Sequence, residues 1–279
     1  MIGRDVAGGA GKPPRVLIIA GSDSGGGAGI QADIKTVTML GGFAMTAITA
    51  ITAQNTLGVR EAMVLPGALV EAQAAAVIED IGVDVVKIGM LGTAEVVAAT
   101  AAILATLPAG TPVVLDPVMI ATSGDALADG GAVAGLHGLM PLASVVTPNL
   151  PELQALTGRV INDEGGMASA ATALAARFDV AVLAKGGHLP GDELVDLLVL
   201  PDGSTTRWSS ARIHTSHTHG TGCTLASGIA NGLGAGLLLA DAVSLARDYV
   251  RAAILAAPGF GGGHGPMGHG LDQAQLPNG

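Results

Sequence analysis

Cysteine and aromatic residues are scarce in this sequence. Its 279 residues include one cysteine, and aromatic side chains make up 2% of the total. A single cysteine excludes an intramolecular disulfide framework and indicates a reducing compartment, so we expect a cytoplasmic protein. With so few aromatic residues the core must be aliphatic, and hydrophobic residues, at 49%, provide enough material for one.

Basic residues are also few. Thirteen lysines and arginines stand against 23 acidic residues, which gives a formal net charge of −10. Because binding to nucleic acid requires a clustered cationic face, we expect no nucleic-acid partner.

One uncharged stretch raises the question of a membrane span. Met39–Val59 has no charged residue and is long enough to cross a bilayer. However, it contains two adjacent glycines, four threonines and the polar pair Gln54 and Asn55. Buried strands of α/β proteins also form near-continuous apolar runs, so we expect no membrane span.

Segments with strand patterns alternate with segments that have helical periodicity. The expected strands are Arg15–Ala20, Ala44–Ala53, Val83–Ile88, Pro112–Leu115, Ser144–Thr147, Val180–Ala184, and a hairpin of Leu194–Leu200 and Thr205–Ile213. The expected helices are Ile30–Leu40, Ala68–Ile81, Ala94–Leu107, Val133–Leu139, Pro151–Leu156, Ala168–Arg177, Thr224–Leu233 and Ala240–Ala256. This alternation predicts an α/β fold with a mainly parallel central sheet and helices on both faces. We expect one domain over residues 15–270, between a disordered leader (1–14) and a flexible tail (271–279).

A glycine-rich segment, Gly21–Gly29, joins the first expected strand to the first expected helix. It lacks the lysine of a P-loop, and it fails the Gly-x-Gly-x-x-Gly dinucleotide fingerprint because Ile30 stands where the third glycine belongs. Gln54 also takes the place of the acidic residue expected at the end of the next strand. We interpret the segment as a backbone-lined ligand floor, with a merely tight strand-to-helix turn as the alternative.

A second turn of small residues, His219–Cys223 (HGTGC), leads into an apolar run. With few side chains in the way, several backbone N–H groups can converge at a helix start, where the macrodipole favours negative charge. The turn therefore predicts a phosphate or oxyanion site formed by Gly220, Thr221 and Gly222. The thiol at its edge, Cys223, is expected to have a lowered pKa and to handle a proton.

Two charged residues are candidates for contacts with a substrate. Asp33 borders the inward face of the first expected helix, where a carboxylate is costly unless it is paired or used. It could accept a hydrogen bond from a substrate hydroxyl or amine, form a salt bridge with Lys35, or lie exposed to solvent at the helix edge. Lys185 ends an expected strand beside two glycines, where it could neutralise a transferring phosphate or remain a solvated surface lysine.

Candidate oxygen ligands for a metal follow two neighbouring strands. Asp116 ends one strand, and Asn149 and Glu152 follow the next. Since Mg²⁺ takes one or two carboxylates together with phosphates and waters, these residues are candidate magnesium ligands, directly or through water. Asn and Glu at such positions are also ordinary helix-capping residues, and that alternative stays open.

Several of these segments resemble the hydroxymethylpyrimidine/phosphomethylpyrimidine kinases of thiamine synthesis, members of the ribokinase-like superfamily. GGAGIQAD together with HGTGC is specific to this branch, whereas GTG alone is shared across the superfamily. The resemblance extends over nearly the whole chain. The matching segments are AGSDSGGGAGIQADIKT (20–36), ITAQNTLGV (51–59), KIGML (87–91), VLDPVM (114–119), TPNLPE (147–152), KGGH (185–188), THGTGCTLASGIA (218–230) and HGPMGH (264–269).

The resemblance implies a ribokinase-like three-layer sandwich that uses MgATP to phosphorylate a pyrimidine alcohol and then its monophosphate. It implies that Gln54 hydrogen-bonds the pyrimidine and that Gly21, Met90 and Val118 line its pocket. Asp33 would hold the hydroxymethyl or amino group. Because the superfamily often forms dimers, a homodimer is expected.

The same resemblance assigns the residues around the phosphates. Gly220 to Cys223 would form the anion hole, Lys185 would contact the phosphates, and Asn149 with Glu152 would organise Mg²⁺ through water. Most ribokinase-like enzymes have an aspartate base where this chain has Cys223, although cysteine also occurs there in the pyrimidine branch. Whether Cys223 is a true base stays open.

Three alternatives remain at this stage. A vitamin B6 kinase of the same fold would phosphorylate a pyridine alcohol of similar shape, which Gln54 could also bind. A dinucleotide-binding oxidoreductase is disfavoured by the failed fingerprint. A non-catalytic small-molecule sensor on the same scaffold is the third. His217, where the family usually has asparagine, is a departure whose effect the sequence leaves unexplained.

Overall fold

The computed structural model describes residues 12–119 and 130–270. In this part of the chain one sheet contains, in spatial order, β10 (Thr205–Ala211), β9 (Glu193–Val199), β8 (Ala181–Lys185), β7 (Val145–Val146), β6 (Val113–Leu115), β5 (Val85–Ile88), β1 (Arg15–Ala20) and β2 (Phe43–Ile48). The strands from β8 to β2 are parallel, and β9 is antiparallel to both of its neighbours. The predicted mainly parallel sheet is confirmed.

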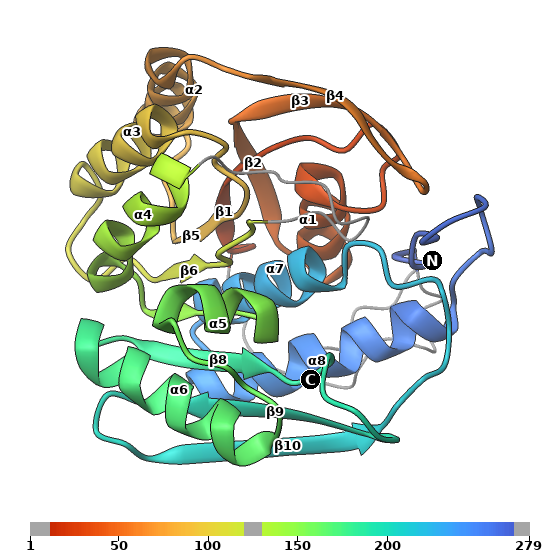
Figure 1. Ribbon diagram of the computed structural model, residues 1–279. Coiled ribbons are helices and arrows are strands. Elements are labelled where there is room, and N and C mark those ends of the chain that lie inside the picture. Colours follow the sequence, from red (N-terminus) through yellow and green to blue (C-terminus); the bar gives the residue numbers. More distant parts are fainter. Residues whose placement is uncertain (1–11, 120–129, 271–279) are drawn as a thin grey trace.

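Helices cover both faces of this sheet (Figure 1). One face packs against α1 (Gly29–Met39), α7 (Thr221–Gly234) and α8 (Leu239–Leu255). The other packs against α2 (Gly67–Asp80), α3 (Ala94–Ala105), α4 (Gly130–Leu139), α5 (Leu150–Thr157) and α6 (Glu164–Phe178), with the short 3₁₀ helix η1 (Met140–Leu142) after α4.

The inner parallel strands are mostly apolar because both of their faces are buried. In β1, Val16 and Ile18 pack toward the layer of α1, α7 and α8, while Leu17 and Ile19 pack toward the opposite layer. All four side chains are fully buried. Alternate residues of a strand point to opposite faces, so a continuous apolar run is what a sheet between two helical layers requires.

The expected strand Ala44–Ala53 is in fact two strands. The chain leaves the main sheet after β2, and β3 (Ala50–Asn55) pairs with β4 (Gly58–Val64) in a separate antiparallel hairpin. Thr49 fixes the break, because its N–H donates to the Ala20 carbonyl and its hydroxyl donates to the Met90 carbonyl. The hairpin extends from the edge of the molecule in Figure 1.

The uncharged stretch Met39–Val59 is accounted for by these strands. It contains the last residue of α1, then β2, β3 and the start of β4. No helix within residues 12–119 and 130–270 is long and apolar enough to cross a membrane. The expected leader lies almost wholly outside the described residues and the expected tail lies wholly outside them, so the domain boundaries stay a prediction.

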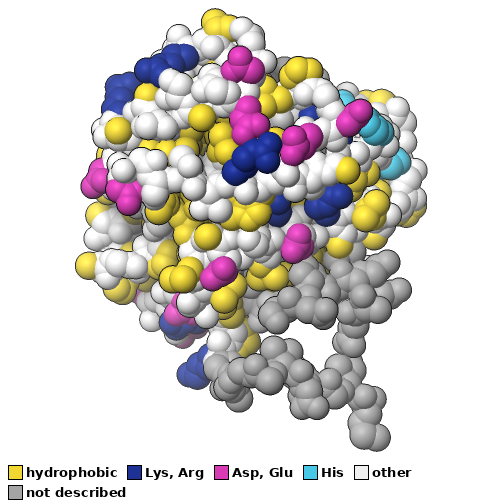
Figure 2. Space-filling model, turned by 90° about the horizontal axis from the view of Figure 1, so that it is seen from below, with side chains coloured by type: hydrophobic (Ala, Val, Ile, Leu, Met, Phe, Trp, Pro, Cys, Tyr) yellow, Lys and Arg dark blue, Asp and Glu magenta, His cyan; other side chains and the backbone are white. Residues whose placement is uncertain are grey.

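The outer edge of the sheet has a mixed-charge surface. Arg207 on β10 forms ion pairs with Glu164 on α6 at 2.7 Å and with Glu193 on β9 at 3.3 Å. Figure 2 shows basic side chains lying singly or beside acidic ones on the face seen from below, rather than gathering into one patch.

Candidate active site

A pocket of about 590 Å³ opens at the carboxyl ends of the parallel strands. Ligands of open α/β sheets bind at this edge. Of the predicted site residues, all except Asp33 line this pocket. They are Gly21, Gln54, Met90, Asp116, Val118, Asn149, Glu152, Lys185, Gly220, Thr221, Gly222 and Cys223.

The start of α7 forms one wall of the pocket. Gly220 is the N-cap residue, and its φ of 85° lies in the left-handed region that favours glycine. A side chain at Gly220 would collide with the backbone carbonyl of Gly27, so the turn and the glycine-rich segment are in direct contact. The N–H groups of a helix's first turn have no partners within the helix, and here they border the pocket. This geometry suits an anion.

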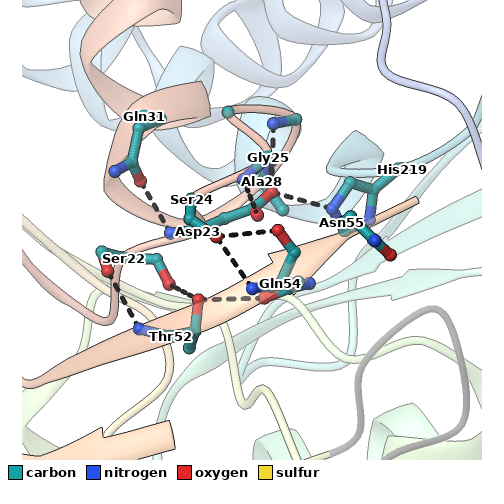
Figure 3. Close-up of polar contacts among 12 residues, drawn as sticks. Ser22, Asp23, Ser24, Gly25, Ala28, Gln31, Thr52, Gln54, Asn55 and His219 are labelled. Atoms are coloured by element: carbon teal, nitrogen blue, oxygen red, sulfur yellow. Dashed lines mark hydrogen bonds and ion pairs between the residues drawn. The ribbon is translucent and has the colours of Figure 1, made fainter. Parts of the chain in front are cut away.

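Asp23 holds the glycine-rich segment in place, and the sequence analysis did not assign it a role. Its side chain is buried and accepts hydrogen bonds from the N–H groups of Gly25, Gly27 and Ala28 at 2.8, 3.0 and 2.8 Å. The same carboxylate lies 2.9 Å from Nε2 of His219 (Figure 3). Burial alone would raise the pKa of Asp23, but the hydrogen bonds from His219 and the backbone lower it below its ordinary value.

Asp23 and His219 therefore join two glycine-rich turns that lie far apart in the sequence. His219 immediately precedes the N-cap of α7, so a shift of the first turn would be transmitted to the second. The available signal was the position of Asp23 three residues after the end of an apolar strand, but nothing in the sequence pairs it with His219.

Gln54 reaches the pocket from the separate hairpin. Its backbone is tied to the segment after β1, because Ser24 Oγ donates to the Gln54 carbonyl at 2.7 Å and the Gln54 N–H donates back to Ser24 Oγ at 2.8 Å. Thr52 Oγ1 donates to the Ser22 carbonyl at 2.9 Å in the same contact (Figure 3). These bonds fix the backbone of Gln54, whose side chain lines the pocket.

Lys185 and Asp116 form a buried ion pair on the pocket floor. Lys185 Nζ lies 2.9 Å from Asp116 Oδ1, which also accepts a hydrogen bond from Thr147 at 2.8 Å. Burial disfavours the charged lysine, but Asp116 and Glu152 outweigh this and raise the pKa of Lys185. The side chain of Lys185 stays 14% exposed, so its ammonium is charged and reachable from the pocket.

Asn149 and Glu152 form a capping box at the start of α5. Asn149 Oδ1 accepts from the Glu152 N–H at 2.9 Å, and Glu152 Oε2 accepts from the Asn149 N–H at 2.8 Å. The capping alternative is thus realised, while both residues also line the pocket. Burial raises the pKa of Glu152 to about 7. The described residues contain no group of three or more His, Cys, Asp or Glu that could hold a metal by themselves.

The expected direct contact between Asp33 and a substrate does not fit the structure. Asp33 is fully buried, does not line the pocket, and binds Lys87 rather than Lys35. Lys35 instead donates to the Gly26 carbonyl at 2.7 Å. The helix face that bears Asp33 is covered by β5 and α7, which supply the partners that a buried carboxylate needs.

The expected low pKa of Cys223 is wrong. Burial raises the pKa of its thiol to about 12, and the opposing charge of Lys87 does not compensate. The helix start alone does not overcome the loss of solvent around the sulfur. Cys223 does line the pocket, as expected, but as a neutral thiol at physiological pH.

The other half of the pocket was missed by the sequence analysis. Arg247 on α8 and Asp196 on β9 form a buried ion pair at 2.8 Å, and Asp196 also accepts from the Gly186 N–H at 3.1 Å. Arg212 donates to three backbone carbonyls of the loop after β8, at 2.7, 2.7 and 2.8 Å. All three side chains line the pocket. The sequence signal for the Arg247–Asp196 pair was a charged residue within the apolar pattern of each of the two segments.

The segment around Gly265 supports the turn His219–Cys223. The N–H of His219 donates to the Gly265 carbonyl, and the N–H of His264 donates to the Thr56 carbonyl at the tip of the β3–β4 hairpin. Gly265 packs so closely on the ring of His217 that a side chain would not fit. The role of His217 beyond this packing is unexplained by the structure.

A model of the phosphomethylpyrimidine kinase family matches residues 23–268. The chain belongs to this family. It is 50% identical over 260 residues to the hydroxymethylpyrimidine/phosphomethylpyrimidine kinase of Streptomyces coelicolor, covering 92% of this chain and 95% of that protein. The predicted kinase class is thereby confirmed.

Solved structures of related kinases have the same fold as this phosphomethylpyrimidine kinase family member. A phosphomethylpyrimidine kinase from Clostridium difficile 630 is 39% identical, with a TM-score of 0.76 over 86% of this chain and 99% of that one. An ADP complex of Bacillus subtilis pyridoxal kinase is 32% identical, with a TM-score of 0.83 over 92% and 97%. The predicted fold class is confirmed by both.

Proposed function

We propose that this kinase transfers the terminal phosphoryl group of ATP to the alcohol of 4-amino-5-hydroxymethyl-2-methylpyrimidine, and then phosphorylates the monophosphate to the diphosphate. The observation that carries this proposal is that one pocket is lined by the start of α7, by Lys185 and by Gln54. The membership of the family supports the same reading, as does the relative named for both activities.

The phosphates are assigned to the first turn of α7. Backbone N–H groups of Gly220–Cys223 and the dipole of a 14-residue helix favour negative charge at this point. Lys185 adds a full positive charge from the end of β8. Phosphoryl transfer is accelerated mainly by positioning and by neutralising charge, and these groups supply both.

The pyrimidine is assigned to the side of Gln54. A carboxamide offers both a donor and an acceptor, and an aminopyrimidine presents the complementary pair on one edge. Gly21, Met90 and Val118 also line the pocket. A side chain at Gly21 would lie 3.1 Å from the sulfur of Met90, so a larger residue would narrow this space.

The donor set fits Mg²⁺ held mainly by nucleotide phosphates and water. Asp116 Oδ1 is engaged by Thr147 and Lys185, and Glu152 Oε2 by the Asn149 N–H. Two carboxylates at the edge of a phosphate site are what Mg²⁺ commonly uses alongside its waters. When bound, the ion supplies neutralisation of the phosphate charge. Asp116, Glu152 and Asn149 would orient its water ligands.

In the transfer itself, the hydroxymethyl oxygen attacks the terminal phosphorus, the bond to the bridging oxygen breaks, and ADP leaves with the electron pair. The hydroxyl proton passes late to an oxygen of the transferred phosphoryl group, once the forming O–P bond has made the hydroxyl acidic. Cys223, being a neutral thiol, contributes chiefly its backbone N–H. We therefore expect Cys223→Ala to lower kcat by about tenfold or less, below the 10²–10⁴ typical of a general base.

Vitamin B6 kinase activity is the second candidate, and the similarity to the Bacillus subtilis pyridoxal kinase structure favours it. An assay coupled to ADP release with the pyrimidine alcohol, its monophosphate and pyridoxal separates the two. We expect the highest kcat/KM with the pyrimidines, and a loss in Gln54→Ala that Glu61→Ala, an exposed residue of the same hairpin, does not show. Faster turnover of pyridoxal would overturn the substrate assignment, and absence of ADP release would overturn the activity.

We further propose that the protein works in the cytoplasm as a homodimer, with residues 15–270 as one kinase domain. The lone cysteine supports a reducing compartment. Sedimentation equilibrium would test the dimer, and a single species of monomer mass would contradict it.

A further inference from the structure

A charged residue interrupts the apolar strand β5. Lys87 is fully buried, and its Nζ lies 3.0 and 2.9 Å from the two carboxylate oxygens of Asp33, which is also fully buried. Ser227 on α7 donates to Asp33 Oδ1 at 2.7 Å. The three side chains thus connect β5, α1 and α7.

The ion pair has a definite orientation. Lys87 lines the pocket, whereas Asp33 does not. A Cβ at Gly89, just after the end of β5, would lie 2.9 Å from Lys87 Nζ, which places the ammonium against the strand end that faces the ligand. The positive end of the pair is therefore directed toward the pocket and the negative end away from it.

The ion pair also lies against α7, which it contacts through Ser227. Ser227 is four residues after Cys223, so the two residues occupy the same side of the helix one turn apart. Among the charges that act on the Cys223 sulfur, Lys87 has the largest effect and favours the anionic form, while Asp33 and Asp116 oppose it. A buried charge acts more strongly on neighbouring groups than a charge at the surface, because water screens it less.

We propose that Lys87 is a positioning residue for the phosphoryl transfer, whose ammonium, anchored from behind by Asp33 and Ser227, favours negative charge at the first turn of α7. This inference rests on the proposed function for its catalytic part. This negative charge is that of the transferring phosphoryl group. The thiolate of Cys223 would be stabilised by the same ammonium, so the thiolate fraction of Cys223 reports its effect.

The test removes both charges together. Replacing only Lys87 would leave a buried, unpaired carboxylate, whereas Asp33→Asn/Lys87→Met keeps the approximate shape and is commonly tolerated in protein cores. Cys223 is the only cysteine and lines the pocket, and a cysteine reacts with iodoacetamide as the thiolate. Its alkylation rate at one mildly alkaline pH therefore reports the local charge without any substrate.

We expect the alkylation rate of the double variant to fall at least about threefold. A rise of one unit in the thiol pKa lowers the thiolate fraction tenfold, and the greater nucleophilicity of the more basic thiolate offsets about half of this effect on a logarithmic scale. We expect kcat to fall about tenfold, with KM for both substrates within about twofold of the parent values. Ile229→Ala, which opens a cavity in α7 without changing charge, controls for loosened packing and should not slow alkylation.

Alkylation that is unchanged or faster in the folded double variant would overturn the proposal, because a purely structural role predicts one of these results. If Asp33→Asn/Lys87→Met does not fold, Asp33→Asn/Lys87→Gln retains an amide–amide hydrogen bond and carries the same expectation. A parent enzyme that phosphorylates none of the substrates would refute the proposed function, while the alkylation rates would still decide the placement of the charge.

Discussion

Gly220→Ala is the substitution that most directly strains the contact between the two glycine-rich turns. Gly220 has a φ of 85°, and a Cβ there would collide with the carbonyl oxygen of Gly27. Gly236 provides a matched control, because its φ is 86° and nothing lies within 4 Å of the added Cβ. Alanine at Gly236 therefore experiences the backbone strain alone.

The two costs can be separated. An alanine in the left-handed region costs about 1–2 kcal/mol, which is all that Gly236→Ala should lose. Forcing a methyl group against packed atoms costs about 1–3 kcal/mol more, so Gly220→Ala should lose about 2–5 kcal/mol. For a protein of this size each kcal/mol lowers Tm by about 2–4 °C. Relief of the collision must move the backbone of Gly27 or the start of α7.

Thermal unfolding and the ADP-release assay together test this reasoning. We expect Gly236→Ala to keep the kcat of the parent enzyme, and Gly220→Ala to lose about 100-fold, the typical effect of displacing catalytic groups by about 1 Å. Equal Tm losses in the two variants, with kcat retained in Gly220→Ala, would refute the proposed contact between the turns.

Three further predictions address individual side chains. Asp23→Asn should lower stability by about 2–4 kcal/mol in urea unfolding, because an amide cannot accept all four hydrogen bonds, and an unchanged midpoint would contradict this. Arg212→Ala frees the pocket-lining loop after β8 without opening the core. It should therefore raise KM for ATP at least about threefold and leave Tm within about 2 °C of the parent value, and an unchanged KM would contradict this. Burial lowers the pKa of His269 to about 4, so its stabilising effect is present above pH 6.5 and lost as the pH falls toward 4. His269→Gln should therefore reduce the loss of unfolding free energy between pH 6.5 and 4, by at most about 3 kcal/mol, and His264→Gln, an exposed control, should not.

The main sheet was accessible from sequence because its strands are short apolar runs that end in polar residues or glycine. The β3–β4 hairpin was not, because Ile51 and Ala53 continue the apolar pattern of β2 across the break at Thr49. Ile51 is in fact 53% exposed. Only the hydrogen bonds of Thr49 to two distant strand ends reveal where the chain leaves the sheet.

The pocket residues at strand ends and in the glycine-rich turns were also predictable, since such residues converge in any parallel sheet. Arg247, Asp196 and Arg212, which line the same pocket, were not. The electrostatics were not. The pairing of Asp33 with Lys87 spans 54 positions, and that of Asp23 with His219 spans 196. The high pKa of Cys223 depends on burial by elements from elsewhere in the chain. Such effects follow from tertiary packing and have no local sequence pattern.

The central claim is that the terminal phosphates of the nucleotide bind at the start of α7. A crystal structure with a non-hydrolysable ATP analogue and the pyrimidine alcohol tests it most directly. We expect the terminal phosphate within hydrogen-bonding distance of the N–H groups of Gly222 and Cys223, with the alcohol oxygen in line on the side of Gln54. Phosphates bound away from these N–H groups would contradict the account.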